Sequence, residues 1–293
     1  MPLPLVTALV RTYQSARTLP FAIASVLAQT VDDLECLVVD DGSTDGTGAV
    51  VSSFGDPRVR YLRHDKNLGR AAARKTGLAA AQGRFIGLLD ADDWWYPWKL
   101  ERQLDILHKE PELPIVSCGM ILLDGSGRPT GVEQSVAEYP SIVRYPAMRA
   151  PAPLPFPNAP ALSRMEVVRH ASIDTNLRRC EDFDFFLQVL LRESSALWPE
   201  PLYACVLPET SRLQAHVESA AAARRVYSKY VRSYPLPSLR RQLECVAKQV
   251  AYAAWARASK HPRPPRRRGR PATPKELADF ERARSEVVGR LRV

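Results

Sequence analysis

The sequence lacks the features of a disulfide-stabilised, zinc-binding or membrane-spanning protein. Its 293 residues include only five cysteines, scattered and without a Cys-x-x-Cys pair, which argues against a disulfide framework and a zinc site and suits a reducing compartment. No stretch approaches the roughly 18 consecutive apolar residues that a membrane span needs, and no basic leader precedes the first apolar run. We therefore expect a soluble, cytoplasmic protein, with peripheral contact to the inner face of the membrane left open.

Outside the C-terminal tail, acidic and basic residues nearly balance. The chain has 41 Lys and Arg against 32 Asp and Glu, and residues 257–293 alone hold twelve basic and four acidic residues. We expect residues 261–293, the basic tail, to be largely disordered because prolines and arginines dominate its first part. An anionic membrane surface suits this charge, and an idle solvated tail is the alternative. DNA is disfavoured as a partner, because the Arg-Gly-Arg-Pro match at 268–271 to a minor-groove motif arises easily by chance.

Short apolar runs alternate with helical patterns along the chain. Strands are expected where Val and Leu gather, and helices where apolar residues recur every three or four positions. The predicted strands are 4–10, 34–41, 58–64 and 84–90, and the predicted helices are 16–29, 68–83, 213–233 and 236–259, with one more starting at Pro97. This order predicts an α/β fold with a Rossmann-like open, mostly parallel sheet flanked by helices, followed by C-terminal helices.

Three carboxylates follow the fourth predicted strand directly. Asp90, Asp92 and Asp93 stand just before a run of aromatic residues, and we expect no nearby Lys or Arg to neutralise their charge. Ligands in open α/β sheets bind beyond the carboxyl ends of the strands. The cluster is therefore either a solvated cap for the next helix or a site for Mg²⁺ or Mn²⁺ carrying a phosphate group.

Three short blocks follow one another in order. They are L-V-V-D-D-G-S-T-D-G-T at 37–47, N-L-G-R-A-A-A-R-K-T-G at 67–77 ahead of L-D-A-D-D at 89–93, and E-D-F-D at 181–184. With the apolar strand and helix before them, they resemble the family 2 glycosyltransferases, which are inverting enzymes with a GT-A fold. The resemblance covers most of residues 4–192. Arg11 stands where the family usually has Pro, and no His lies at the family's place after the third block; these departures concern the acceptor side.

The resemblance implies a nucleotide site. Thr12 and Tyr13 would line the pocket for base and ribose, and Asp41 would accept a hydrogen bond from the base. Arg74 would lie close to the nucleotide, and Asp90 would face the ribose. From the sequence alone, Tyr13 could equally be a core-facing aromatic residue and Arg74 a surface cation.

The resemblance also implies the groups that do the chemistry. Asp92 would bind Mn²⁺ or Mg²⁺ at the diphosphate, with Asp93 as an assisting ligand. Asp182 would be the catalytic base that deprotonates the acceptor hydroxyl, and Glu181 would orient or tune it, while Asp184 is expected to point elsewhere. The alternative for Asp182 is a solvated acid in the first turn of a helix.

The implied function is metal-dependent, inverting transfer of a sugar from a nucleoside-diphosphate sugar, with UDP as the expected nucleotide. The acceptor would be a hydroxyl of a saccharide or of a lipid-linked acceptor, in cell-surface polysaccharide or glycoconjugate synthesis. A nucleotidyltransferase is one alternative, but the turn after the first strand has no glycine to cradle a triphosphate. A non-catalytic nucleotide-sugar-binding protein is the other, and the presence of Asp182 argues against it.

Four segments are expected. Residues 1–110 form the nucleotide-sugar-binding half and residues 111–212 the acceptor-binding, catalytic half of one GT-A domain. Residues 213–260 form the C-terminal helices, and the basic tail ends the chain. The Pro-rich stretch 140–160 is predicted to be an ordered loop over the active site, with a disordered linker as the alternative.

Overall fold

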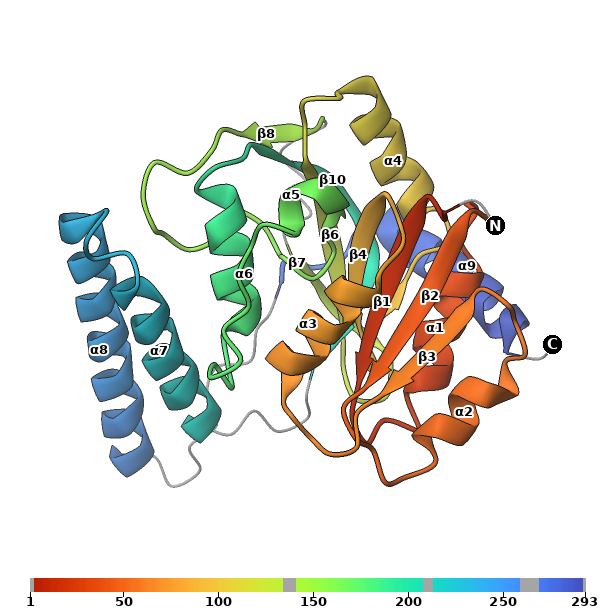
Figure 1. Ribbon diagram of the computed structural model, residues 1–293, viewed down its shortest axis with the longest axis horizontal. Helices are drawn as coiled ribbons and strands as arrows, with labels where there is room; N and C mark the ends of the chain where they lie inside the picture. The colour runs from red at the N-terminus through yellow and green to blue at the C-terminus, as the bar shows by residue number, and fades with distance from the viewer. Residues whose placement is uncertain (1–2, 134–140, 208–212, 259–268, 292–293) are drawn as a thin grey trace.

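The computed structural model describes residues 3–133, 141–207, 213–258 and 269–291 (Figure 1). The strands are β1 (Val6–Thr12), β2 (Leu34–Asp40), β3 (Val59–Arg63), β4 (Phe85–Asp90), β5 (Trp94–Trp95), β6 (Ile115–Leu123), β7 (Pro129–Glu133), β8 (Val143–Tyr145), β9 (Leu162–Arg164) and β10 (Ser195–Val206). The helices are α1 (Leu19–Leu27), α2 (Thr47–Ser53), α3 (Arg70–Ala80), α4 (Lys99–Lys109), α5 (Met165–Val168), α6 (Glu181–Leu190), α7 (Leu213–Ser228), α8 (Pro235–Ala258) and α9 (Pro274–Arg290). The predicted strands and helices are confirmed with shifted ends; the helix expected to start at Pro97 begins at Lys99.

One sheet runs through the molecule in the order β3-β2-β1-β4-β9-β6-β10-β5, with β7 paired to β6 and β8 to β10. The first four strands of this order are mutually parallel, whereas β9 runs antiparallel to both of its neighbours. The expected open, mostly parallel sheet is therefore confirmed. Strand order reverses at β1, which lies between β2 and β4, so a crevice opens where the carboxyl ends of these three strands meet.

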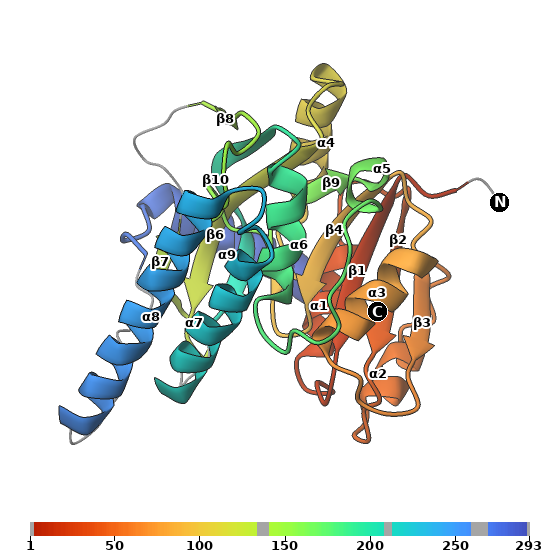
Figure 2. The ribbon, with the colours of Figure 1, turned by 60° about the vertical axis from the view of Figure 1, so that its left-hand side comes forward.

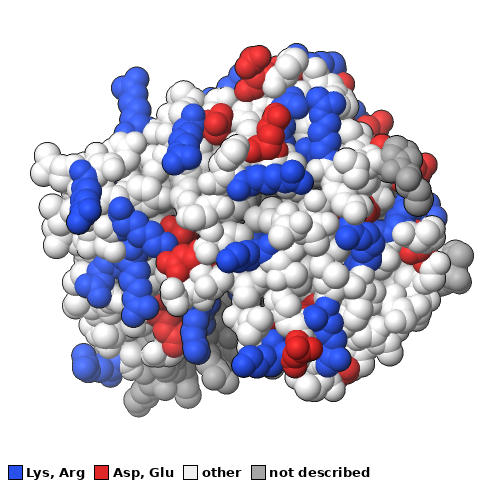
Figure 3. Space-filling view, viewed as in Figure 1, with Lys and Arg blue, Asp and Glu red and all other residues white. Residues whose placement is uncertain are grey.

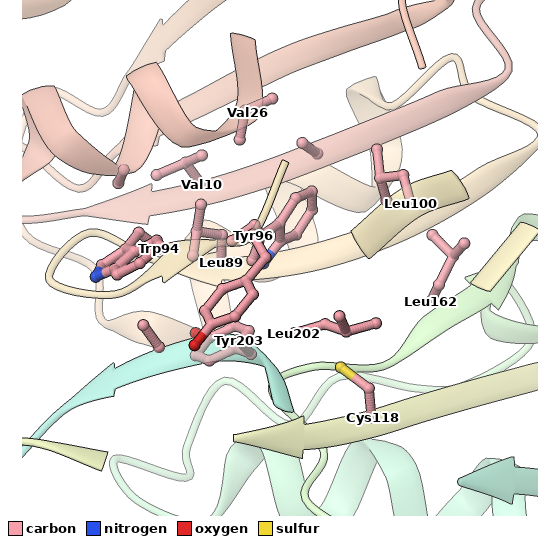
Figure 4. Packing of buried hydrophobic residues seen from close by; sticks show 14 of the residues in the cluster. Val10, Val26, Leu89, Trp94, Tyr96, Leu100, Cys118, Leu162, Leu202 and Tyr203 are labelled. Atoms are coloured by element: carbon pink, nitrogen blue, oxygen red, sulfur yellow. The ribbon is translucent and has the colours of Figure 1, made fainter. Parts of the chain in front are cut away.

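The two faces of the sheet build two cores, because alternate side chains of a strand point to opposite sides. On β1, Val6, Ala8 and Val10 belong to the cluster shared with α1, α4 and α9, whereas Leu9 belongs to the cluster shared with α3, α5 and α6. Figure 4 shows the first cluster, in which Val10 of β1 lies near aromatic residues that follow β4. Burial on both faces explains why the strands read as nearly continuous apolar runs.

The basic tail contains a packed helix, so the expectation that it is largely disordered is wrong for α9. The Thr273 side chain accepts a hydrogen bond from the backbone N–H of Glu276, and the Glu276 side chain accepts one from the backbone N–H of Thr273. This capping box starts a helix whose buried face consists of Phe280, Ala283 and Val287. Figures 1 and 2 show α9 against the same face of the sheet as α1. Residues 261–268, including the first arginine of the suspected DNA motif, lie outside the described residues.

Helices α7 and α8 form an antiparallel hairpin at one end of the molecule (Figures 1 and 2). A small third cluster joins the hairpin to α6, and it contains Leu187, Val226, Tyr227 and Cys245. None of the helices within the described ranges combines the length and the apolar content that crossing a bilayer requires. The expected segment boundaries at residues 110 and 212 stay predictions.

Candidate active site

A polar crevice of ≈ 1000 Å³ lies at the carboxyl ends of β1, β2 and β4. Four arginines line it, namely Arg11, Arg17, Arg70 and Arg178, together with the carboxylates of Asp41, Asp90 and Asp92. The register of the sheet creates this meeting, because Arg11 is paired with Asp90 and Thr12 with Asp40 across neighbouring strands. Three polar segments far apart in the sequence therefore converge on one site.

Asp41 organises the loop that leads into α3. Its carboxylate accepts hydrogen bonds from the backbone N–H groups of Leu68 (2.9 Å) and Gly69 (2.7 Å) and lies 2.8 Å from Nδ1 of His64. Gly42 follows with a φ of +80°, and a Cβ there would lie 2.5 Å from the backbone of Lys66, so only glycine fits this close approach. Asp41 lines the crevice as expected, and its hydrogen bond to a nucleotide base stays a prediction.

Thr12 and Tyr13 lie on the floor and wall of the crevice. The Thr12 hydroxyl is buried and has no hydrogen-bond partner among the described residues, so it is free to bond a ligand or water in the crevice. Tyr13 is 48% exposed and lines the crevice, so the alternative of a core-facing aromatic residue is wrong. Gln14, at φ 54°, binds the loop after β2 through Thr44 and so ties the two turns together.

Arg11 neutralises part of the acidic cluster, which corrects the expectation of a cluster without a nearby cation. Its guanidinium donates to Asp90 at 2.7 Å and to Glu181 at 3.2 Å. Burial lowers the pKa of Arg11, but the charges of Asp90, Glu181 and Asp182 outweigh burial and raise the pKa above its usual value, so the guanidinium stays charged. Arg11, which stands where the family usually has Pro, thus links the acidic motif at the end of β4 to the start of α6.

Asp92 is the open carboxylate of the cluster. Its side chain is exposed in the crevice. Partial loss of hydration, followed by the negative charge of Asp90, raises the pKa of Asp92, while the positive charge of Arg70 lowers it. A bound cation would relieve this repulsion. No group of three or more His, Cys, Asp or Glu able to hold a metal occurs in the described part of the chain. Asp90 and Asp92 together offer two carboxylates and open space, which fits Mg²⁺ or Mn²⁺ completed by phosphate and water.

Asp93 turns away from the crevice and does not line it, so its expected assistance to the metal finds no support here and stays a prediction. Its two oxygens accept hydrogen bonds from the Tyr203 hydroxyl at 2.7 Å and the Val206 backbone N–H at 2.8 Å, both on β10. Burial, followed by the charges of Asp92 and Asp90, raises its pKa well above the usual range. Asp93 therefore anchors the chain after β4 to the other half of the sheet.

Asp182 lies in the first turn of α6 with both oxygens engaged. Oδ2 accepts a hydrogen bond from the Asn158 side chain and Oδ1 from the Phe183 backbone N–H, each at 2.8 Å. Burial raises the pKa of Asp182, but the charge of Arg74, the Asn158 hydrogen bond and the charge of Arg11 outweigh it and hold the pKa below the usual range. The carboxylate is therefore ionised at neutral pH. Asn158, which makes this contact, lies in the Pro-rich stretch 140–160, and the expectation that this stretch is an ordered loop over the active site stays a prediction.

Arg74 is buried, so the alternative of a surface cation is wrong. Its guanidinium lies 5.3 Å from the ring centre of Phe185, and Nε and Nη1 have no partner among the described residues. Burial and the charge of Arg11 lower the pKa of Arg74 to about 10, while Asp182 opposes the shift. Arg74 acts on Asp182 from beneath the crevice, and its contact with a nucleotide stays a prediction.

The two neighbours of Asp182 point in different directions. Glu181 is buried and accepts the hydrogen bond from Arg11, which suits its expected tuning role. Asp184 binds Lys229 at 2.8 Å on the far side of α6, away from the crevice. Sequence reasoning did not single out Arg17, Arg70, Arg178 or Asn158. Arg17 follows β1 and Arg70 begins α3, and these positions near strand ends could have predicted that both line the crevice. No local pattern indicates Asn158.

The sequence is similar to known proteins over its first half. Residues 7–145 match the sequence model described as Glycosyl transferase family 2. The chain is 38% identical over 140 residues to the succinoglycan biosynthesis protein ExoO of Rhizobium meliloti, which spans 47% of this chain and 40% of that protein. It is 42% identical over 105 residues to UDP-Glc:alpha-D-GlcNAc-diphosphoundecaprenol beta-1,3-glucosyltransferase WfgD of Escherichia coli, spanning 36% of this chain and 42% of the relative. The chain thus matches less than half the length of either relative.

The fold is similar to solved structures over nearly the whole chain. S. aureus TarS 1-349 in complex with UDP-GlcNAc superposes with a TM-score of 0.65 at 16% identity, covering 98% of this chain and 81% of that one. Mannosyltransferase PcManGT from Pyrobaculum calidifontis, in complex with GDP-Man and Mn2+, gives a TM-score of 0.60 at 17% identity, covering 99% and 86%. These likenesses identify the expected GT-A fold.

Proposed function

Because residues 7–145 match the sequence model of glycosyl transferase family 2, we propose that the protein is a metal-dependent, inverting glycosyltransferase. It transfers a sugar from a nucleoside-diphosphate sugar, with UDP as the nucleotide, to a hydroxyl of a saccharide or lipid-linked acceptor. Polysaccharide or glycoconjugate synthesis is the setting that the names of ExoO and WfgD support. The name of WfgD includes both UDP-Glc and a diphosphoundecaprenol acceptor, and the TarS complex contains UDP-GlcNAc.

One observation carries the proposal, which is the meeting of two carboxylates and a basic wall in a single crevice. Asp90 and Asp92 face the crevice, and Arg17, Arg70 and Arg178 line it. A diphosphate needs both features, because its charge must be balanced by cations and by hydrogen-bond donors. The unpartnered Thr12 hydroxyl and the exposed Tyr13 ring suit the nucleoside end of the same ligand.

Asp92 would hold the cation through its carboxylate. Asp90, whose expected place facing the ribose stays a prediction, lines the crevice beside it and would supply a second oxygen. When bound, Mn²⁺ or Mg²⁺ would stabilise the negative charge that develops on the leaving diphosphate. The charge of Arg70 favours the ionised form of Asp92, and Arg11 holds Asp90 in place through its 2.7 Å contact. Asp93 fixes the chain beside Asp92 by its bonds to β10.

Asp182 would take the proton from the acceptor hydroxyl. Its carboxylate is ionised at neutral pH because Arg74, Asn158 and Arg11 together hold the pKa low. A low pKa makes a weak base in isolation, so the proton transfer would accompany bond formation rather than precede it. Direct displacement from the face opposite the diphosphate inverts the anomeric carbon.

Thermal-shift titration tests the proposal directly. UDP should raise the melting temperature in the presence of Mn²⁺ and much less in EDTA, with GDP and dTDP as comparisons; saturation 100-fold above Kd corresponds to about 2.7 kcal/mol. Asp92→Ala should lose the Mn²⁺-dependent shift and the turnover of UDP-sugars. Asp105→Ala, at an exposed acid on α4, should retain both. Full nucleotide binding and turnover in EDTA would refute the metal role, and no shift with any nucleotide would refute the function.

A further inference from the structure

Helix α8 exposes a continuous apolar stripe that no other described part of the chain covers. The stripe consists of Leu236, Leu239, Leu243, Val246 and Val250, which are 79%, 48%, 70%, 38% and 63% exposed. Their spacing of three and four residues places them on one face of the helix. The opposite face already packs against α7 and α6 through Cys245 and Tyr227. The helix therefore has two apolar faces, of which only one is used within the fold, and an exposed stripe of this kind marks an interaction surface.

The charge around the stripe identifies its partner. Residues 213–258 contain eight Lys and Arg against two Glu, a net charge of +6. Both glutamates are already paired with arginines, Glu218 with Arg179 and Glu244 with Arg240 and Arg241. Figure 3 shows Lys and Arg outnumbering acids over the end of the molecule that α7 and α8 form.

This positive charge distinguishes between two candidate partners for the stripe, a second copy of the protein and a lipid surface. Pairing α8 with a second copy of itself would bring together two surfaces on which Lys and Arg outnumber acids, and such like-charge contacts are unfavourable. An anionic lipid surface would instead neutralise these basic residues, while the leucines and valines enter the boundary between headgroups and acyl chains. Charge complementarity thus favours lipid over a second copy.

The hairpin is fixed to one wall of the crevice. Lys229, just after α7, binds Asp174 and Asp184 at 2.8 Å each, and Arg179 binds Glu218 of α7 at 2.9 Å. Residues 175–178 lie between these anchors and line the crevice. A surface bound by α8 is therefore held at a fixed distance from this wall of the crevice.

We propose that the α8 stripe docks the protein on an anionic bilayer and so presents the crevice to an acceptor carried by lipid. The docking stands on the stripe and the charge, whereas the acceptor part rests on the proposed function. The part of the basic tail that forms α9 packs in the core, whereas membrane contact through the rest of the tail stays a prediction.

Cosedimentation of the full chain with vesicles tests the docking. The protein should bind vesicles of phosphatidylcholine with phosphatidylglycerol, more weakly at high salt, and should bind phosphatidylcholine alone poorly. One lipid-buried leucine corresponds to about tenfold in partition or more, so Leu239→Gln/Leu243→Gln should lose at least that factor. Leu3→Gln is the matched control, because Leu3 is 71% exposed at the other end of the chain. The altered side chains are on the surface, so UDP and Mn²⁺ binding and the melting temperature should stay at wild-type values.

Several results would overturn the proposal. Equal vesicle binding by the double variant and the wild type would exclude the stripe, and equal binding to neutral vesicles would exclude the anionic partner. A wild-type dimer in light scattering that becomes a monomer in the double variant, without vesicle binding by either, would assign the stripe to self-association. Failure of UDP binding with intact vesicle binding would instead count against the proposed function alone.

Discussion

The packing of α9 leads to a stability prediction. Its outcome distinguishes a tail helix that is docked on the domain from the expected unpacked tail. Phe280 is 1% exposed, and its ring centre lies 5.5 Å from that of Trp94. Truncating such a phenylalanine to alanine costs about 3–5 kcal/mol, because both the transfer free energy and the packing around the ring are lost. At roughly 2–4 °C per kcal/mol, Phe280→Ala should lower the melting temperature by roughly 6–20 °C.

The matched control lies one turn earlier on the same helix. Leu277 is 41% exposed, so Leu277→Ala should change the free energy of unfolding by only about 0.5 kcal/mol. Urea and thermal unfolding followed by circular dichroism measure both variants. A Phe280→Ala protein that melts with the wild type would mean that α9 is not docked on the domain, and deletion of residues 274–293 should then also be harmless.

Three further predictions concern the site. Asp182→Asn should bind UDP and Mn²⁺ normally while sugar transfer falls roughly 10²–10⁴-fold, and product analysis of the wild type should find the inverted anomer; a retained anomer or near-normal transfer would exclude this base. Because Arg74 lowers the pKa of Asp182, Arg74→Met should raise that pKa. As the pH falls, the variant should therefore lose activity at a higher pH than the wild type does. An acidic limb in the pH profile of kcat/KM that does not move would contradict the coupling. Asn158→Ala, which removes the 2.8 Å hydrogen bond to Asp182, should shift the same limb in the same direction, whereas Asn176→Ala on the crevice wall should leave it in place.

The first half of the fold could be predicted because its signals are local. Each parallel strand is a short apolar run buried on both faces, and the rule that ligands bind beyond the carboxyl ends of strands places Thr12, Asp41 and Asp90 at one edge. The register confirms that edge by pairing Arg11 with Asp90. Strand periodicity and topology predict this edge, whereas the nucleotide-binding roles of Thr12 and Asp41 rest on the family resemblance.

The rest of the site depends on contacts between residues far apart in the chain. Arg11 reaches Asp90 across 79 residues and Glu181 across 170, and Asp93 reaches Tyr203 across 110. No local pattern distinguishes a carboxylate that faces a crevice from one that turns inward. The wrong expectation that α9 would be disordered has a different cause, because the sequence contains recognisable signals for this helix. Thr273 and Glu276 form a capping-box pattern, and Phe280, Ala283 and Val287 follow at helical spacing, but the arginines and prolines before them dominated the composition.

The aromatic residues after the acidic motif connect α9 to the site. Trp94 stacks on Tyr96 with ring centres 5.4 Å apart and contacts Phe280 of α9, while the backbone of Trp94 pairs with β10. On the other side of Asp92, Asp90 is the last residue of β4. The single exposed acid is therefore held between a strand end and an aromatic anchor, which limits where its carboxylate can point. We expect Phe280→Ala, measured well below its melting temperature, to weaken Mn²⁺-dependent UDP binding more than Leu277→Ala does, although neither residue touches the crevice. Equal nucleotide affinity in the two variants would mean that the anchoring of Asp93 on β10 is sufficient to position Asp92 without α9.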